Sequence, residues 1–200
     1  MNRTLRFTTP LLLALSLGLL GLGSLWSPAA EAHKGHGGPM VKFMKTKATL
    51  KALLPKGAKV VKRKSRLSGD STEWAESTFG IDLDNRIHTY FLARDRSSGK
   101  TLAGAIIMKF SYRHGDVMLA VGVDSEQKLT GAVIQGISEK YIPDFEGTVG
   151  KGILSGYAGK SVAELAQAAK SHDGDKPSRF IAEKLAEEAA LMAAFLHQSK

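Results

Sequence analysis

The sequence predicts an α+β domain, an antiparallel sheet meander with helices at both ends of the domain. Two observations lead to this prediction. Strand-like runs follow one another over residues 87–137, with only short turns between them. Helical patterns are confined to the two ends of the domain, at residues 40–54 on one side and at residues 162–169 and after Pro177 on the other.

The first 32 residues have the pattern of a secretory signal peptide. Two arginines precede an uncharged, largely apolar run over residues 7–30. The tripeptide Ala30-Glu31-Ala32 then offers small residues at the two positions that signal peptidase recognises. We therefore expect cleavage before His33 and a periplasmic or otherwise exported location. The alternative is an uncleaved membrane anchor, because the apolar run is long enough to span a bilayer if tilted.

The charge of the remaining 168 residues is unevenly placed. After removal of residues 1–32, 26 basic and 18 acidic residues leave a net charge of +8. Ten of the basic residues, and no acidic one, fall within residues 42–66. Such a block favours phosphate, an acidic protein or a membrane surface as partner, and an exported location disfavours nucleic acid. The alternative is a solvated basic face without a specific partner.

The elements of the domain are expected in a simple order. Residues 33–39 are rich in glycine and form a flexible leader, and the domain itself covers residues 40–200. The leader is followed by an amphipathic helix, a charged edge strand, four further strands, a glycine-rich loop and two helices. Their expected ranges are 40–54, 58–67, 87–94, 102–110, 117–123, 129–137, 147–159, 162–169 and from Pro177 onward.

Candidate chemistry is sparse. The chain has no cysteine, which excludes disulfides, thiolate catalysis and iron–sulfur ligation. No spacing brings serine, histidine and aspartate together as a catalytic triad, so we expect a non-catalytic redox or binding protein. His33 and His36 are the local metal candidates, and with a free α-amine at His33 they suit copper(II) or nickel(II). The alternative is a disordered leader that contains two histidines by chance.

Three segments resemble the FMN-binding domain family. They are Pro55-Lys56-Gly57-Ala58, the stretch 88–104 (HTYFLARDRSSGKTLAG) and the stretch 115–134 (GDVMLAVGVDSEQKLTGAVI). The family includes peripheral subunits of the sodium-translocating NADH:quinone reductase and of the Rnf complex, and also small exported flavoproteins. The resemblance covers about residues 50–196 and implies a role in electron transfer with a redox or membrane-complex partner.

The resemblance breaks down at the family's flavin motif, where a threonine hydroxyl at the start of the last helix is esterified by the FMN phosphate. The corresponding stretch here is 173–179 (DGDKPSR), and Lys176 stands at the threonine position. Lysine has no hydroxyl, so covalent flavin is not expected. Non-covalent FMN at Gly174, Lys176, Ser178 and Arg179 stays open, because a helix N-terminus attracts phosphate.

Two alternatives to an exported FMN-binding-domain-like protein therefore remain. In the first, Asp175 only caps the last helix, flavin has been lost, and the domain is a protein-interaction module that uses the basic 42–66 surface. In the second, the leader histidines make the protein a metal-binding module.

Overall fold

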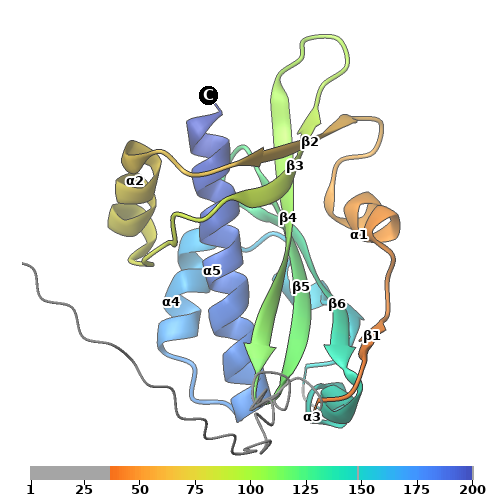
Figure 1. Cartoon of the computed structure of the whole chain (residues 1–200). Coiled ribbons are helices and arrows are strands. Elements are labelled where there is room, and N and C mark those ends of the chain that lie inside the picture. The colour runs from red at the N-terminus through yellow and green to blue at the C-terminus, as the bar shows by residue number, and fades with distance from the viewer. Residues whose placement is uncertain (1–36, 148, 200) are drawn as a thin grey trace, which may run out of the picture.

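The computed structural model of the chain describes residues 37–147 and 149–199 (Figure 1). The predicted signal peptide, its cleavage site and both leader histidines lie outside the described residues, so these predictions remain predictions. Among the helices that are described, none combines the length and the apolar character needed to cross a bilayer.

The predicted fold class is confirmed. The sheet is antiparallel throughout, its main strand order is β1-β6-β5-β4-β3-β2, and β7 pairs with β6. The strands are β1 (Met40–Lys42), β2 (Lys59–Ser65), β3 (His88–Arg94), β4 (Thr101–Tyr112), β5 (Gly115–Asp124), β6 (Leu129–Ser138) and β7 (Gly152–Ile153). The edge strand and the four-stranded meander predicted from the sequence are therefore present, with boundaries shifted by a few residues.

Helices cover the two faces of the sheet unequally (Figure 1). The long helix α5 lies across one face, with α2 and α4 packed beside it, and the short helix α1 lies on the other face. The α-helices are α1 (Thr46–Leu53), α2 (Gly69–Phe79), α3 (Ile142–Glu146), α4 (Val162–Lys170) and α5 (Lys176–Gln198).

The helix predicted over residues 40–54 is wrong in its first third. Residues Met40–Lys42 form β1, and α1 begins only at Thr46. The strand is possible because Gly136 of β6 lets the backbones approach closely: a Cβ at this position would lie 2.8 Å from the carbonyl oxygen of Val41. Pairing with a strand almost a hundred residues away overrides the local helical periodicity.

The described end of the expected leader is packed against the sheet. Gly37 is buried, and its carbonyl accepts a hydrogen bond of 3.2 Å from the backbone N–H of Lys140. A Cβ at Gly37 would lie 2.7 Å from the Cα of Gly115, so glycine is needed for this approach. The chain is therefore held in place from residue 37 onward.

Helix α2 was not predicted from the sequence. Its N-terminus is capped by Ser68, whose hydroxyl accepts from the backbone N–H of Ser71. Its C-terminus is closed by Gly80 in the left-handed conformation, with φ of 63°. Trp74 on this helix stacks on His197 near the end of α5, with ring centroids 4.3 Å apart. Helix α2 thus ties the segment before β3 to the C-terminal helix.

Candidate functional site

The start of α5 carries the residues predicted to bind flavin. Asp175 is the N-cap, and its carboxylate accepts a hydrogen bond of 2.8 Å from the backbone N–H of Ser178. This bond holds the pKa of Asp175 below its usual value. Lys176 is the first helical residue, so the position of the family's acceptor threonine falls in the first turn. The capping predicted as the alternative to a ligand is therefore present.

A hollow of about 360 Å³ lies beside this helix start. The glycine-rich segment before α4 supplies most of its wall, and His172 and Ser178 complete it. The lining residues are Val149, Ile153, Leu154, Ser155, Gly156, Tyr157, His172 and Ser178. Apolar side chains, three hydroxyl-bearing side chains and a histidine ring thus line one hollow.

The four predicted cofactor residues are not all brought together. Ser178 lines the hollow, whereas the side chains of Lys176 and Arg179 are exposed and do not line it. Gly174 lies under the ring of His172, because a Cβ there would be 2.5 Å from Nε2 of that histidine. A larger residue at position 174 would therefore require the histidine ring to shift.

His172 and Tyr157 are contributors to the hollow that the sequence did not single out. The Nε2 atom of His172 is buried and has no hydrogen-bond partner among the described residues. Partial burial raises the pKa of the Tyr157 phenol, which therefore stays a neutral hydrogen-bond donor at physiological pH. Their chain positions, beside a glycine-rich loop and just before a helix start, could have suggested them.

These observations test the fit of FMN. Covalent attachment does not fit, because Lys176 offers no hydroxyl and Ser178 is the third residue of α5, two positions further along the helix. For non-covalent attachment the hollow offers a few apolar side chains, a phenol and an unpartnered histidine nitrogen, and its wall is of mixed rather than predominantly apolar character. Two exposed basic side chains at the helix start would face a phosphate, and the Asp175 carboxylate would oppose it.

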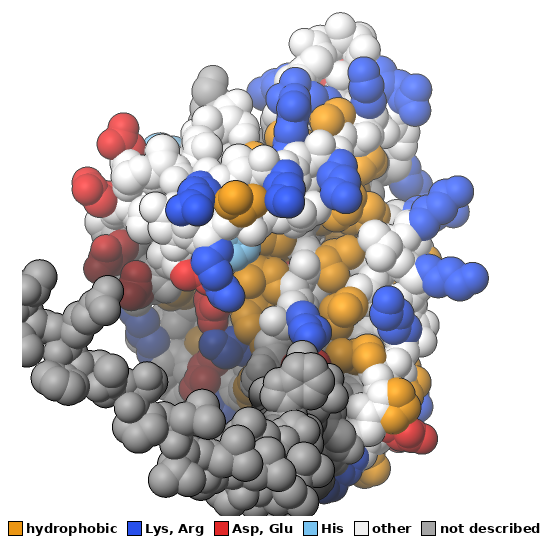
Figure 2. Space-filling view, in the orientation of Figure 1, with side chains coloured by type: hydrophobic (Ala, Val, Ile, Leu, Met, Phe, Trp, Pro, Cys, Tyr) orange, Lys and Arg blue, Asp and Glu red, His pale blue; other side chains and the backbone are white. Residues whose placement is uncertain are grey.

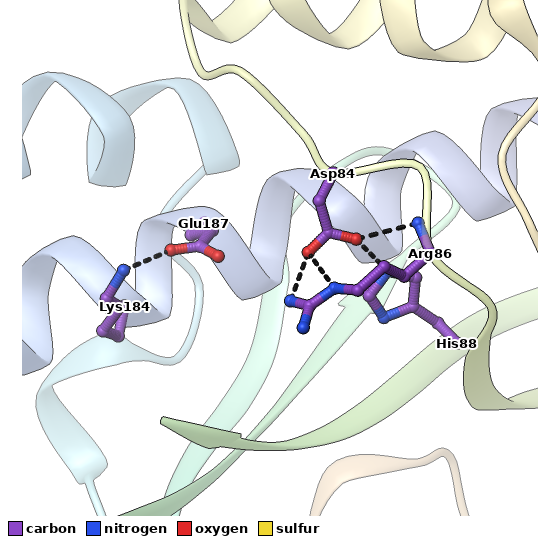
Figure 3. Close-up of polar contacts among 5 residues, drawn as sticks. All are labelled: Asp84, Arg86, His88, Lys184 and Glu187. Atoms are coloured by element: carbon purple, nitrogen blue, oxygen red, sulfur yellow. Dashed lines mark hydrogen bonds and ion pairs between the residues drawn. The ribbon is translucent and has the colours of Figure 1, made fainter. Parts of the chain in front are cut away.

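A second polar centre lies away from this hollow, before and within β3 (Figure 3). Asp84 accepts from the backbone N–H and the guanidinium of Arg86, and lies 2.9 Å from Nε2 of His88. The hydrogen bonds from Arg86, with a smaller contribution from His88, hold the pKa of Asp84 well below its usual range. The ring of His88 is buried, and its hydrogen bond with the Asp84 carboxylate fixes its orientation. Neither Asp84 nor His88 was predicted from the sequence to take part in a polar centre.

Helix α5 faces this centre with further charges. Lys184 pairs with Glu187 at 2.6 Å, and both appear on the neighbouring helix in Figure 3. Glu188 is completely buried, and burial raises the pKa of its carboxyl well above the usual value, although the nearby Met108 N–H opposes the shift. Neither carboxyl oxygen of Glu188 has a hydrogen-bond partner within normal geometry in the described part of the chain.

The described residues contain no group of three or more histidine, cysteine, aspartate or glutamate side chains arranged to hold a metal ion. Comparison with known proteins found no matching family model, no matching curated protein and no matching solved structure. The resemblance to the FMN-binding domain family therefore remains an inference from the motifs in the sequence.

Proposed function

We propose that this protein is an exported flavoprotein-like carrier that binds FMN non-covalently and serves an electron-transfer system. One observation carries the proposal. The hollow beside the first turn of α5 lies at the place where the family resemblance puts the cofactor, and Ser178 belongs to both. FMN would supply the redox chemistry when bound.

Different residues of the chain would contact different parts of FMN. Leu154 and Ile153 would exclude water from one side of a planar ring, and Tyr157 would donate a hydrogen bond from its neutral phenol. Lys176 and Arg179 would attract the phosphate at the helix start. No residue of the hollow has the arrangement of a nucleophile with its base, so binding and positioning are the roles assigned to them.

Fluorescence titration of the mature protein with FMN tests the proposal. Binding should quench flavin fluorescence, and denaturation should release all flavin from the chain. Lys176→Glu should weaken binding about tenfold at low salt, because it reverses a charge beside the phosphate, and added salt should reduce the difference. Lys100→Glu, a charge reversal at the exposed turn between β3 and β4, is the matched control and should leave affinity unchanged.

Two results would reject the proposal. The first is an absence of quenching at millimolar FMN with protein purified from its own host. The second is equal affinity in the Lys176→Glu variant and the native protein, which would place the phosphate elsewhere. Flavin that stays on the chain through a denaturing gel would instead contradict the argument that Lys176 prevents attachment.

Metal binding by the leader is the alternative of a different class. It rests on His33 and His36 alone, since the described residues add no metal-ligand cluster to them. Calorimetry with copper(II) on the mature protein, compared with the His33→Ala/His36→Ala variant, decides this alternative. Equal affinity in the two proteins would eliminate the leader as a site.

A further inference from the structure

The edge strand β2 and the groove beside it form a surface that neither the flavin hypothesis nor the metal hypothesis uses. Strand β2 ends the main strand order of the sheet, and among the described strands it pairs with β3 alone. Its seven residues pair with β3 in one unbroken register, from Lys59 opposite Arg94 to Ser65 opposite His88. Its outer side therefore presents a regular row of backbone donors and acceptors of the kind that accepts another strand.

An open groove of about 700 Å³ lies between α1, the turn that follows it and Val60 near the start of this strand. Its floor is apolar, with Leu50 from α1, Leu54 directly after this helix and Val60 from β2. Val60 keeps 46% of its surface exposed, which is high for a valine on a sheet face. Helix α1 is too short to cover this part of the sheet, so the groove stays open beside the strand.

Basic side chains border the groove and the strand. Lys47, Lys51 and Lys56 belong to the groove itself, and Lys62 and Lys64 share the face of β2 that carries Val60. No acidic residue occurs between residues 42 and 66, and no ion pair joins any of these lysines to a described carboxylate. Figure 2 shows the resulting row of Lys and Arg side chains along the strand, with apolar surface next to it.

We propose that β2 and the groove bind an acidic, extended segment of a partner protein by strand addition. Backbone hydrogen bonds to the open edge would supply affinity, and an apolar side chain of the partner would enter the groove at Val60. Acidic side chains would lie opposite Lys62 and Lys64, whose charges have no partner within the described chain. The proposal is independent of flavin binding.

The charge pattern selects this occupant over two others. A second copy of the chain would place lysine opposite lysine along the edge, and like charges directly opposite one another destabilise a strand pair. A flat anionic membrane could satisfy the lysines, but it offers no strand to the backbone groups of β2 and does not fill a concave groove. An acidic strand satisfies the charges, the backbone and the groove together.

The first test uses a fluorescein-labelled peptide of about ten residues in which glutamate and valine alternate, with both ends blocked. Anisotropy should show saturable binding to the mature protein at low salt. Lys62→Glu should weaken binding about fivefold or more, whereas the matched reversal Lys100→Glu should change it less than twofold. Both residues are exposed, so unfolding curves should confirm that both variants remain folded.

The second test separates strand addition from simple charge attraction. The same peptide, N-methylated at alternate backbone amides, keeps its charge but cannot add as a strand, and it should bind at least tenfold more weakly. Hydrogen exchange should show added protection at alternate amides of β2 when the unmodified peptide is bound.

Equal binding of the methylated and unmodified peptides would overturn the proposal, since charge alone would then explain affinity. An equal loss of peptide affinity in the Lys62→Glu and Lys100→Glu variants would show that the peptide does not bind at β2. Binding to phosphatidylglycerol vesicles without binding to the peptide would also overturn it and would make the surface a membrane contact. Because FMN affinity should be unaffected by Lys62→Glu, failure here is distinguishable from failure of the flavin proposal.

Discussion

The α5 face and the α1 face of the sheet differ in how completely helices close them. In α5, thirteen of 23 residues are buried, whereas two of the eight residues of α1 are buried. Large side chains seal the α5 face, among them Phe195, which stacks on Tyr90 of β3 with ring centroids 4.2 Å apart. On the α1 face the sheet side chains are mostly alanine and valine, and part of the surface stays open. The first face is closed by packing, and the second leaves part of its surface uncovered.

Truncation of one large side chain on each face should produce the largest difference. Phe195 is fully buried, so Phe195→Ala should lower the free energy of unfolding by about 3–5 kcal/mol. Leu50 on α1 is half-buried at the groove, and Leu50→Ala should cost only about 1 kcal/mol. Urea unfolding followed by circular dichroism measures both. Equal losses would show that the α1 face contributes as much packing as the α5 face.

Two sheet glycines sharpen the comparison, because each lets a helix approach one face. A Cβ at Gly122 would meet Thr130 Oγ1 and, at 2.7 Å, the carbonyl oxygen of Leu53, which is the acceptor of the Thr130 hydroxyl. Backbone cannot move aside easily, so Gly122→Ala should cost about 1–3 kcal/mol. A Cβ at Gly104 would meet the terminal methyl of Met192, which can rotate away, so Gly104→Ala should cost less than about 1 kcal/mol.

Thermal unfolding of the two glycine variants distinguishes these costs. The reverse order would mean that the methionine cannot repack on the crowded α5 face. In that case the α5 face would be the more rigid of the two, and the backbone at Leu53 would move away easily from a side chain added at position 122.

Each face also buries a polar group, and the group on the α1 face is satisfied. The side-chain amide of Gln135 donates to Thr49 Oγ1 over 2.9 Å, and both residues are buried. Thr49→Val removes the acceptor and leaves the buried amide of Gln135 without a hydrogen-bond partner from this residue. It should therefore lower the free energy of unfolding by about 1–2 kcal/mol. Gln135→Leu combined with Thr49→Val should recover part of the loss, because no polar atom of the pair is then buried alone. A double variant that is less stable than either single variant would contradict this account.

The sequence was sufficient for the sheet, because its strands alternate or run apolar between short turns and pair mainly with their neighbours. It was insufficient where pairing is distant, as in β1, whose partner Gly136 lies far along the chain. It also missed α2, whose apolar residues form no clear stripe, although Ser68 and Gly80 are capping signals at its two ends.

For the candidate site, sequence reasoning placed Lys176 and Ser178 correctly at the start of α5. It did not find Tyr157 and His172, because a hollow forms only when the glycine-rich segment folds back onto the helix start. Asp84 and His88 are four residues apart, but they lie in a loop and at a strand start, where this spacing has no helical meaning. Such contacts depend on the path of the chain and are absent from local patterns.

Glu188, the buried glutamate of the α5 face, should make the free energy of unfolding depend on pH. Replacing it should have the smallest effect of these substitutions at acid pH, and an effect that grows as the pH rises. Burial raises the folded-state pKa of Glu188 above its unfolded value of 4.5, so its contribution to stability is fully present below that pH. As the pH rises through the folded-state pKa, the unfolded state ionises first and this contribution is lost. In the Glu188→Gln variant this side chain is uncharged at every pH, so the variant cannot lose stability in this way.

The free energies of unfolding of the two proteins should therefore differ by less than about 1 kcal/mol well below pH 4.5, because the side chain at position 188 is then uncharged in the folded and the unfolded state of both. The Gln variant should become the more stable protein as the pH is raised toward about 8, since its side chain never has to bear a buried charge. Asp84, His88 and Lys184 are present in both proteins, so their own pH dependence cancels in the difference, whereas the negative charge of neighbouring Glu187 adds to the rise in the pKa of Glu188 and acts in the same direction. Urea unfolding at several pH values measures this difference directly. A difference that stays constant with pH would mean that Glu188 is ionised in the folded protein and is paired with a cation or with water, and the α5 face would then be less dry than its packing indicates.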